Sequence, residues 1–222
     1  MTVWERLTEA LEAEERGVLL TCVAGEPLGA KLLVLESGER VGDETLAPYA
    51  DARVTGTTAD EERTVLAELV GPPLHLVIFG AVDLAESLCR IAAALGWRTT
   101  VVDPRGGLAT RERIPSADEL VLQWPDEVAE LVGPRTAVVS LVHEQRLDVP
   151  AVAVGLERGA FYVGALGSKR TAQKRLDGLA ERGTAGAERI SGPVGLDIGA
   201  VTPAEIALSI AAEIVARLRS PD

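Results

Sequence analysis

The chain has few cysteines, few basic residues and no long apolar run, and each scarcity excludes a class of protein. Its only cysteines, Cys22 and Cys89, lie in separate apolar segments of the 222 residues, so neither a disulfide framework nor a cysteine-based metal site is indicated. No apolar run approaches the roughly 18 residues of a membrane span, and "MTVWERLTEALEAEERG" is a charged amphipathic helix pattern rather than a signal peptide. We therefore expect a cytoplasmic protein without membrane segments.

Basic residues are outnumbered by acidic ones. The 22 lysines and arginines face 34 aspartates and glutamates, which gives a formal net charge of −12. Such a field repels polyanions, so nucleic acid and anionic membrane surfaces are not expected partners. With 47% hydrophobic residues the chain can bury a sizeable core, as one large domain or two small ones.

The familiar catalytic motifs are also missing. The sequence has no Gly-x-Ser-x-Gly, no Walker loop and no His-Glu-x-x-His, and no local motif pairs a nucleophile with a base. Tyr162 and Lys169 do not have the spacing of a tyrosine-lysine reductase pair on one helix face. Binding therefore suits the sequence better than catalysis, although an enzymatic role stays open.

The first third of the chain predicts a small α+β domain. After the first helix, "GVLLTCVAG" and "GAKLLVLESGERVG" are typical of strands, and a helix is expected from about Ala59 to Val70. Gly71-Pro72-Pro73 ends that helix, because proline lacks an N–H donor and disfavours helical backbone in the residue before it. We place a domain boundary there, between domains of residues 1–71 and 72–222.

From Leu74 onward apolar strands alternate with helices. The strands are nearly continuous apolar runs, as parallel strands buried on both faces are, and the connections are long enough for crossover helices. Thr202, Pro203 and Glu205 form a capping box with proline at the first helical position of the last helix. The pattern predicts a doubly wound, mostly parallel Rossmann-like sheet, with helices at 83–95, 125–132, 148–157, 169–182 and 203–219.

The turn after the first strand of this domain keeps part of a dinucleotide-binding pattern. Gly80 takes the first glycine position, but Val82 takes the second, where a branched side chain crowds a pyrophosphate. Asp83 places a negative charge where the phosphate would bind. Asp103 lies where a carboxylate could accept hydrogen bonds from a ribose. NAD(P) binding is one interpretation. The alternative that we favour is an ordinary strand-to-helix turn capped by Asp83, with Asp103 capping the following loop.

Three other segments contain residues that could face a ligand. In "YVGALGSKRTAQKRL", Ser168 is a predicted helix cap followed by Lys169 and Arg170, whose charges oppose the helix dipole unless an anion binds there. The alternative is that both side chains extend into solvent. Asp197, in the glycine-rich stretch 191–210, could accept amino groups or cap its own turn. His143 follows a strand, where it could bind a ligand or donate to a carbonyl.

The segments "FYVGALGSKRT", "PVGLDIGAVTPAEIALSI" and "GAKLLVLESGERVG", with the variant Rossmann turn between them, resemble the xanthine dehydrogenase accessory (XdhC/CoxI) family. The resemblance covers most of the chain in the same order. It implies a cytoplasmic, commonly homodimeric chaperone that binds molybdenum cofactor (molybdopterin) as cargo, assists its sulfuration by a cysteine desulfurase, and delivers it to an apo molybdenum hydroxylase of the xanthine or carbon monoxide dehydrogenase type. It further implies ligand-facing residues at Gly80, Asp103, His143, Gly164, Gly167, Ser168, Lys169, Arg170, Asp197 and Gly199.

The chain departs from the family pattern at two places. Gly80-Ala81-Val82-Asp83 stands where the family usually has Gly-Ala-Gly-His, and "VGDETLAPYADARV" lacks the family's Gly-Gly-Cys-Val-Glu motif. The alternatives to a cofactor chaperone are therefore an NAD(P)-dependent oxidoreductase and a ligand-free scaffold protein on a degenerate Rossmann fold.

Overall fold

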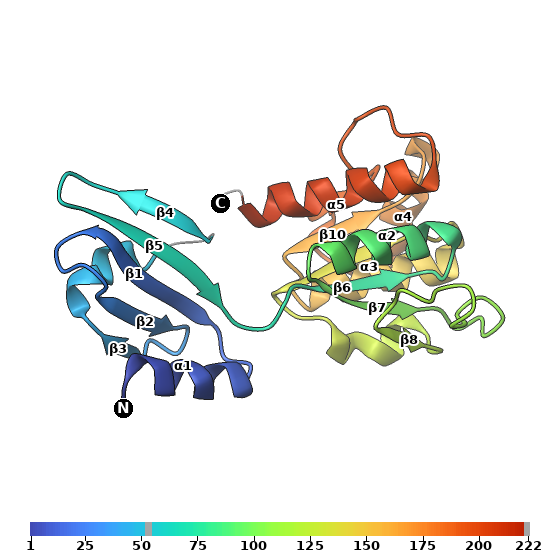
Figure 1. Ribbon diagram of the computed structural model, residues 1–222. Coiled ribbons are helices and arrows are strands. Elements are labelled where there is room, and N and C mark those ends of the chain that lie inside the picture. The colour runs from blue at the N-terminus through green and yellow to red at the C-terminus, as the bar shows by residue number, and fades with distance from the viewer. Residues whose placement is uncertain (52–54, 220–222) are drawn as a thin grey trace. The chain divides into compact units, whose positions relative to one another are not determined.

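The computed structural model describes residues 1–51 and 55–219, except for the side chain of Lys169. The chain forms two compact units, the first from Met1 to Pro72 and the second beginning at Pro73 (Figure 1).

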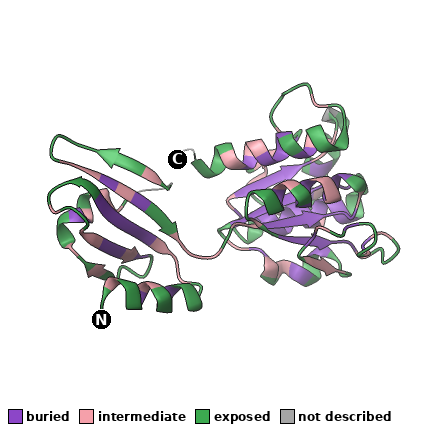
Figure 2. Cartoon of the chain, viewed as in Figure 1, coloured by how far each residue is buried: buried purple, intermediate pink, exposed green. Residues whose placement is uncertain are grey.

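The first unit is an antiparallel sheet with the strand order β3-β2-β1-β5-β4. Helix α1 packs on one face around Ala10, and the 3-10 helix η1 packs on the other around Leu46. Figure 2 shows the buried residues concentrated in the central strands. The elements are α1 (Val3–Glu12), β1 (Gly17–Gly25), β2 (Lys31–Leu35), β3 (Arg40–Gly42), η1 (Glu44–Tyr49), β4 (Gly56–Ala59) and β5 (Arg63–Val70).

The predicted helix from Ala59 to Val70 is wrong. The Asp60 carboxylate accepts hydrogen bonds from the N–H groups of Glu62 and Arg63, which makes a turn between β4 and β5. Strand β5 then pairs with β1 along its whole length, from Gly17 opposite Val70 to Gly25 opposite Arg63. The alanine, glutamate and leucine residues of this segment have good helix propensity, but cross-strand pairing overrides a weak local preference.

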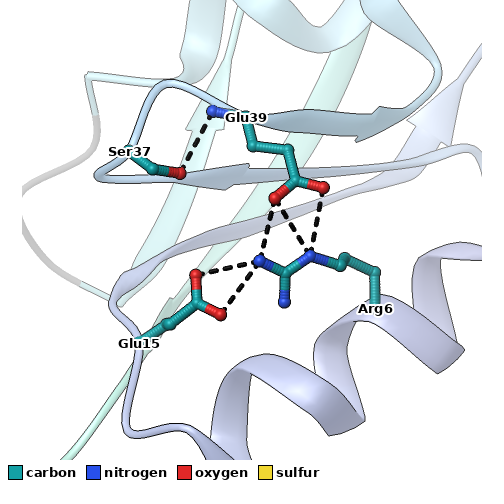
Figure 3. A network of polar contacts seen from close by, with 4 residues as sticks. All are labelled: Arg6, Glu15, Ser37 and Glu39. Atoms are coloured by element: carbon teal, nitrogen blue, oxygen red, sulfur yellow. Dashed lines mark hydrogen bonds and ion pairs between the residues drawn. The ribbon is translucent and has the colours of Figure 1, made fainter.

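An arginine network joins α1 to the strands (Figure 3). The Arg6 residue is 8% exposed. Its Nη2 lies 2.9 Å from an oxygen of Glu15 and 2.8 Å from an oxygen of Glu39, which lies in the turn between β2 and β3. This pairing attaches the helix to the sheet beside its apolar contacts, so Arg6 has a structural role.

The second unit is a six-stranded parallel sheet with the order β11-β10-β9-β6-β7-β8. Helices α2 and α5 share one core with the sheet, and α3 and α4 share the other (Figure 1). Its strands are β6 (His75–Phe79), β7 (Arg98–Val102), β8 (Glu119–Val121), β9 (Thr136–Ser140), β10 (Tyr162–Ala165) and β11 (Ile190–Ser191). Its helices are α2 (Asp83–Ala94), η2 (Pro125–Leu131), α3 (Gln145–Glu157), α4 (Lys169–Arg182), η3 (Ala187–Arg189) and α5 (Pro203–Arg219).

This arrangement confirms the predicted doubly wound Rossmann-like fold. Along β6, Leu76 and Ile78 enter one core while Val77 and Phe79 enter the other, which is why the strand is a continuous apolar run. Two predicted helices differ in detail: η2 is a short 3-10 helix interrupted at Val128, and α3 begins at Gln145 rather than 148. The Thr202–Glu205 capping box is confirmed by reciprocal hydrogen bonds of 2.8 and 3.3 Å.

Candidate functional site

Most of the candidate site residues lie at the carboxyl edge of the parallel sheet. Phe79 pairs with Val102 on one side and with Ser140 on the other, and Ser140 pairs with Ala165. The carboxyl ends of these four strands are therefore in register. The chain order reverses at β6, which has β7 and β9 as neighbours, and open α/β sheets bind ligands at such a switch point.

Gly80 has a packing role at the end of β6. Its φ of +110° is a left-handed conformation, and an added Cβ would lie 2.6 Å from Cγ1 of Val142. Val82 is the N-cap residue of α2 and makes no side-chain cap, so the prediction that Asp83 caps this turn is wrong. Asp83 lies in the first turn of the helix and pairs with Arg113 at 3.1 Å instead. The α2 N-terminus thus carries a negative charge from its own chain at the place of a dinucleotide phosphate.

Asp103, at the end of β7, is fully buried and fully engaged. One carboxylate oxygen accepts from the Ala81 N–H at 2.9 Å and from Arg105 Nη2 at 2.7 Å. The other accepts from the Arg105 N–H at 3.0 Å and Nε at 2.8 Å. Burial raises the pKa of Asp103, but the hydrogen bonds from Arg105 and Ala81 outweigh it, so the pKa lies below its usual value. The interpretation that Asp103 caps the following loop is confirmed.

The hydrogen bonds that already occupy the Asp103 carboxylate predict weak or no dinucleotide binding. Asp103 would have to release Arg105 to accept a ribose, and Val82 and Asp83 oppose a pyrophosphate. We expect calorimetric titration with NAD or NADP to give no binding heat at millimolar concentration, whereas an established Rossmann dehydrogenase titrated alongside gives a clear isotherm. Micromolar binding of either dinucleotide would contradict this interpretation.

His143 and Glu144 follow β9 and are exposed. The described part of the chain offers the His143 ring no hydrogen bond, so the carbonyl-bound alternative is not seen. The hydrogen bonds to Asp103 raise the pKa of Arg105, and the charge of Glu144 contributes to this rise. Arg105, which follows β7, and Glu144, which follows β9, therefore interact electrostatically at this edge of the sheet.

The turn after β10 leads into α4. Gly164 is buried in the strand, where a Cβ would lie 2.6 Å from Val194. Gly167 has a φ of +143°, and a Cβ there would lie 2.9 Å from Cβ of Thr171. Ser168 is the N-cap residue, as predicted, and its hydroxyl accepts from the Thr171 N–H at 3.4 Å. The two glycines thus make the close packing of the turn possible.

The start of α4 carries no anion of its own. Its first turn contains no acidic residue, and by geometry the first N–H groups of a helix have no partner within it. Arg170 is exposed, and the side chain of Lys169 lies outside the described part of the structure. Positive charge at the positive end of a helix dipole is unfavourable in the absence of an anion.

The loop from Gly192 to Val201 is held at both ends. Glu213 of α5 accepts from the Gly195 N–H and from the Tyr162 hydroxyl, each at 2.6 Å. Burial and this hydrogen bond raise the pKa of Tyr162. At the other end, the Val201 N–H donates to Glu205 at 2.8 Å. Both ends of the loop are therefore fixed by hydrogen bonds.

Asp197 and Gly199 lie exposed in this loop. Within the described ranges, no hydrogen bond or ion pair joins either residue to the turn before α4, and none shows Asp197 capping its own turn. The structure thus places Gly164 in β10, Gly167 and Ser168 in the turn that follows it, and Gly80, Asp103 and His143 on the same sheet edge. Asp197 and Gly199 lie in a separate loop.

A buried ion pair beneath the turn was not predicted. Arg175 of α4 is 2% exposed and Asp148 of α3 is 1% exposed. The Arg175 Nε donates to Asp148 at 2.8 Å, and its Nη2 donates to the Leu166 carbonyl at 2.8 Å. One sequence signal could have indicated that Arg175 is buried. It lies four residues before Leu179, which is fully buried, and this spacing puts both residues on the same face of a helix.

The described residues contain no group of three or more histidine, cysteine, aspartate or glutamate side chains placed to hold a metal ion. Among those same residues, no helix has both the length and the apolar character needed to cross a bilayer.

Comparison with known proteins identifies relatives that match most of the chain. It is 27% identical over 219 residues to a probable xanthine dehydrogenase subunit of Bacillus subtilis, a match that covers 96% of this chain and 64% of the relative. It is 30% identical over 145 residues to the "Molybdenum cofactor insertion chaperone PaoD" of Escherichia coli, covering 64% of this chain and 40% of that protein. The chain thus spans less than two thirds of these relatives' length.

A solved structure also aligns with both units. The crystal structure of a xanthine dehydrogenase from Bacillus halodurans superposes with a TM-score of 0.75 at 25% identity, covering 98% of this chain and 64% of that one. The family model described as the XdhC Rossmann domain matches residues 76–214, which is most of the second unit and more than half of the chain. The resemblance predicted from the sequence motifs is confirmed, and the chain belongs to the XdhC family.

Proposed function

We propose that this protein is an accessory factor that binds molybdenum cofactor and assists its insertion into a molybdenum hydroxylase. Membership of the XdhC family and similarity to a protein named as a molybdenum cofactor insertion chaperone support this role. In this proposal the protein is a carrier rather than a catalyst. It receives the cofactor, keeps it during sulfuration by a cysteine desulfurase, and docks on the apo hydroxylase, with a homodimer as the working form.

The observation that carries the proposal is the start of α4. Ser168 caps the helix, the first turn has no acidic residue, and Arg170 is exposed beside it. Every one of these features suits a bound phosphate. Molybdopterin carries such a phosphate, so its terminal group would lie against the turn from Gly167 to Arg170.

We assign the pterin to exposed polar groups outside this turn. Its amino and amide edge needs acceptors and donors, and Asp197 and His143 are exposed and without a hydrogen-bond partner in the described ranges. Asp103 is already engaged, so we assign it to holding the Ala81 turn rather than to the ligand. The domain arrangement that we propose is a small domain of residues 1–71 followed by a Rossmann domain of residues 72–222.

Purification tests this function. We expect protein purified anaerobically from a molybdenum-replete host to carry pterin and molybdenum, detected by mass spectrometry and metal analysis, because the start of α4 and the exposed Arg170 offer donors to the phosphate. The variant Lys169→Ala/Arg170→Ala, prepared in parallel, is expected to carry far less. Wild-type protein free of both pterin and molybdenum would contradict the proposal.

The second candidate is a ligand-free scaffold. Val82 and Asp83 in place of the usual glycine and histidine favour it, as does the missing Gly-Gly-Cys-Val-Glu motif. This candidate would be supported if pull-down recovers hydroxylase subunits while the same preparation contains no pterin.

A further inference from the structure

The buried charges beneath the turn before α4 connect three elements and the turn after β10. Asp148 of α3 accepts from the Ser140 hydroxyl of β9 at 2.6 Å and from Arg175 Nε of α4 at 2.8 Å. Arg175 Nη2 donates to the carbonyl of Leu166, the residue that follows β10, at 2.8 Å. Ser140, Asp148 and Arg175 are each at most 2% exposed.

Stability alone is a weak reason for this network. Taking an arginine and an aspartate out of water is so unfavourable that well-packed apolar residues of similar volume are often as good or better. The network has one contact that an apolar pair could not replace, the hydrogen bond to the Leu166 carbonyl. That carbonyl belongs to the peptide unit joining Leu166 to Gly167, which directly precedes the Ser168 cap.

Fixing this carbonyl also fixes the next N–H. A trans peptide unit is planar, so its C=O and N–H point in opposite directions. Because Arg175 holds the Leu166 carbonyl toward the buried guanidinium, the Gly167 N–H must point away from it. Gly167 has a φ of +143°, and glycine accepts such backbone geometry without a side-chain penalty, so without Arg175 this peptide could rotate.

Arg175 also borders the second glycine-rich segment. Its Nη1 lies 3.9 Å from the position that a Cβ on Gly192 would occupy. The guanidinium therefore lies between the turn before α4 and the loop that leads to Asp197.

We propose that Arg175, held by Asp148, is the positioning residue of the phosphate site, aligning the Gly167 N–H with the first N–H groups of α4. This inference rests on the proposed function, because it assigns a role in binding the same phosphate. Arg175 acts through the backbone of the turn, and Asp148 and Ser140 keep its guanidinium in one orientation.

The test compares three proteins with two probes, anaerobically released molybdopterin and inorganic phosphate. Arg175→Met leaves Asp148 buried and unpaired, so the informative variant is the double change Asp148→Asn/Arg175→Met, which removes both charges and keeps the volume. The matched control is Thr99→Val, which removes another buried side-chain hydrogen bond, to Asp118, near the start of β7 and away from α4. Melting temperatures are measured first, and titrations follow where all three are folded.

We expect the double variant to bind both probes about tenfold more weakly, because one charge-assisted hydrogen-bond arrangement is lost. The Thr99→Val control should bind as the wild type does. In ¹⁵N spectra the Gly167 amide resonance should shift when phosphate is added to the wild type and stay in place in the double variant. A general loss of stability would not remove that response selectively.

The outcomes separate the two proposals. If wild-type protein binds neither probe, the carrier function is overturned together with the positioning role. If the wild type binds and the folded double variant shows the same affinity and the same Gly167 response, only the role of Arg175 is overturned. Should the double variant fail to fold, Arg175→Lys replaces it, since one ammonium cannot reproduce the two-nitrogen fork, and unchanged affinity there would reject the positioning role.

Discussion

Replacing Lys169 and Arg170 together by alanine is expected to weaken molybdopterin binding by about a hundredfold, the loss of two charge-assisted contacts. The melting temperature should stay nearly unchanged or rise slightly. At the N-terminus of α4 these cations oppose the helix dipole, and Arg170 is exposed, so neither is expected to stabilise the unbound fold. Fluorescence or calorimetric titration under anaerobic conditions measures the affinity.

The control for this variant removes the same number of positive charges at a distant place. Arg90 on α2 and Arg217 on α5 are exposed helix cations of the same unit, and replacing both by alanine removes the same two positive charges. Their loss should change the affinity only through the weak, salt-screened field of the whole protein. Equal affinity in the Lys169→Ala/Arg170→Ala variant and the wild type would reject the phosphate site.

The second large effect concerns stability. Asp103→Asn is expected to lower the free energy of unfolding of the second unit by about 3 kcal/mol at neutral pH, because it removes a buried carboxylate that accepts charge-assisted hydrogen bonds. Asp103 is fully buried and accepts four hydrogen bonds, three from Arg105 and one from Ala81. Denaturant unfolding followed by circular dichroism measures the difference.

The same variant makes a prediction about pH. The folded pKa of Asp103 is lowered, so the ionised carboxylate contributes its full stability above the unfolded pKa of about 3.9. This contribution is lost as the pH falls through the folded pKa. The difference between wild type and Asp103→Asn should therefore be constant near neutral pH and shrink below about pH 4.

A surface pair provides the comparison for Asp103. Asp126 pairs with Arg182 at 2.5 Å, but its side chain is 50% exposed, and exposed ion pairs contribute between zero and about 1 kcal/mol. Asp126→Asn should therefore change the unfolding free energy by less than about 1 kcal/mol. If both asparagine variants have the same small effect, Asp103 is not the clamp that the geometry indicates.

The predicted part of the site is the part that depends on short stretches of chain. The helix cap at Ser168 and the absence of an acidic residue beside it can be read from neighbouring residues. The capping box of Thr202 and Glu205 is equally local, and both caps are present. Such signals survive folding because the groups that form them are three residues apart.

The same dependence on distance explains the errors and omissions. The segment from Arg63 to Val70 has helical composition, yet β1, nearly fifty residues earlier at Gly17–Gly25, pairs with it and makes it a strand. Arg175 and Asp148 are 27 residues apart in sequence, and Ala81 and Asp103 are 22 apart. No local pattern specifies which buried charge will meet which partner.

The sequence by itself determined the Rossmann-like unit and the family, because parallel strands buried on both faces and capped helices leave repeated local patterns of apolar and capping residues. Tertiary structure decided what each polar group does. It engaged Asp103 with Arg105 and Ala81, and it placed Arg175 beneath the turn before α4. The physical reason is that a hydrogen bond or ion pair depends on position and orientation in three dimensions, which packing between distant elements sets.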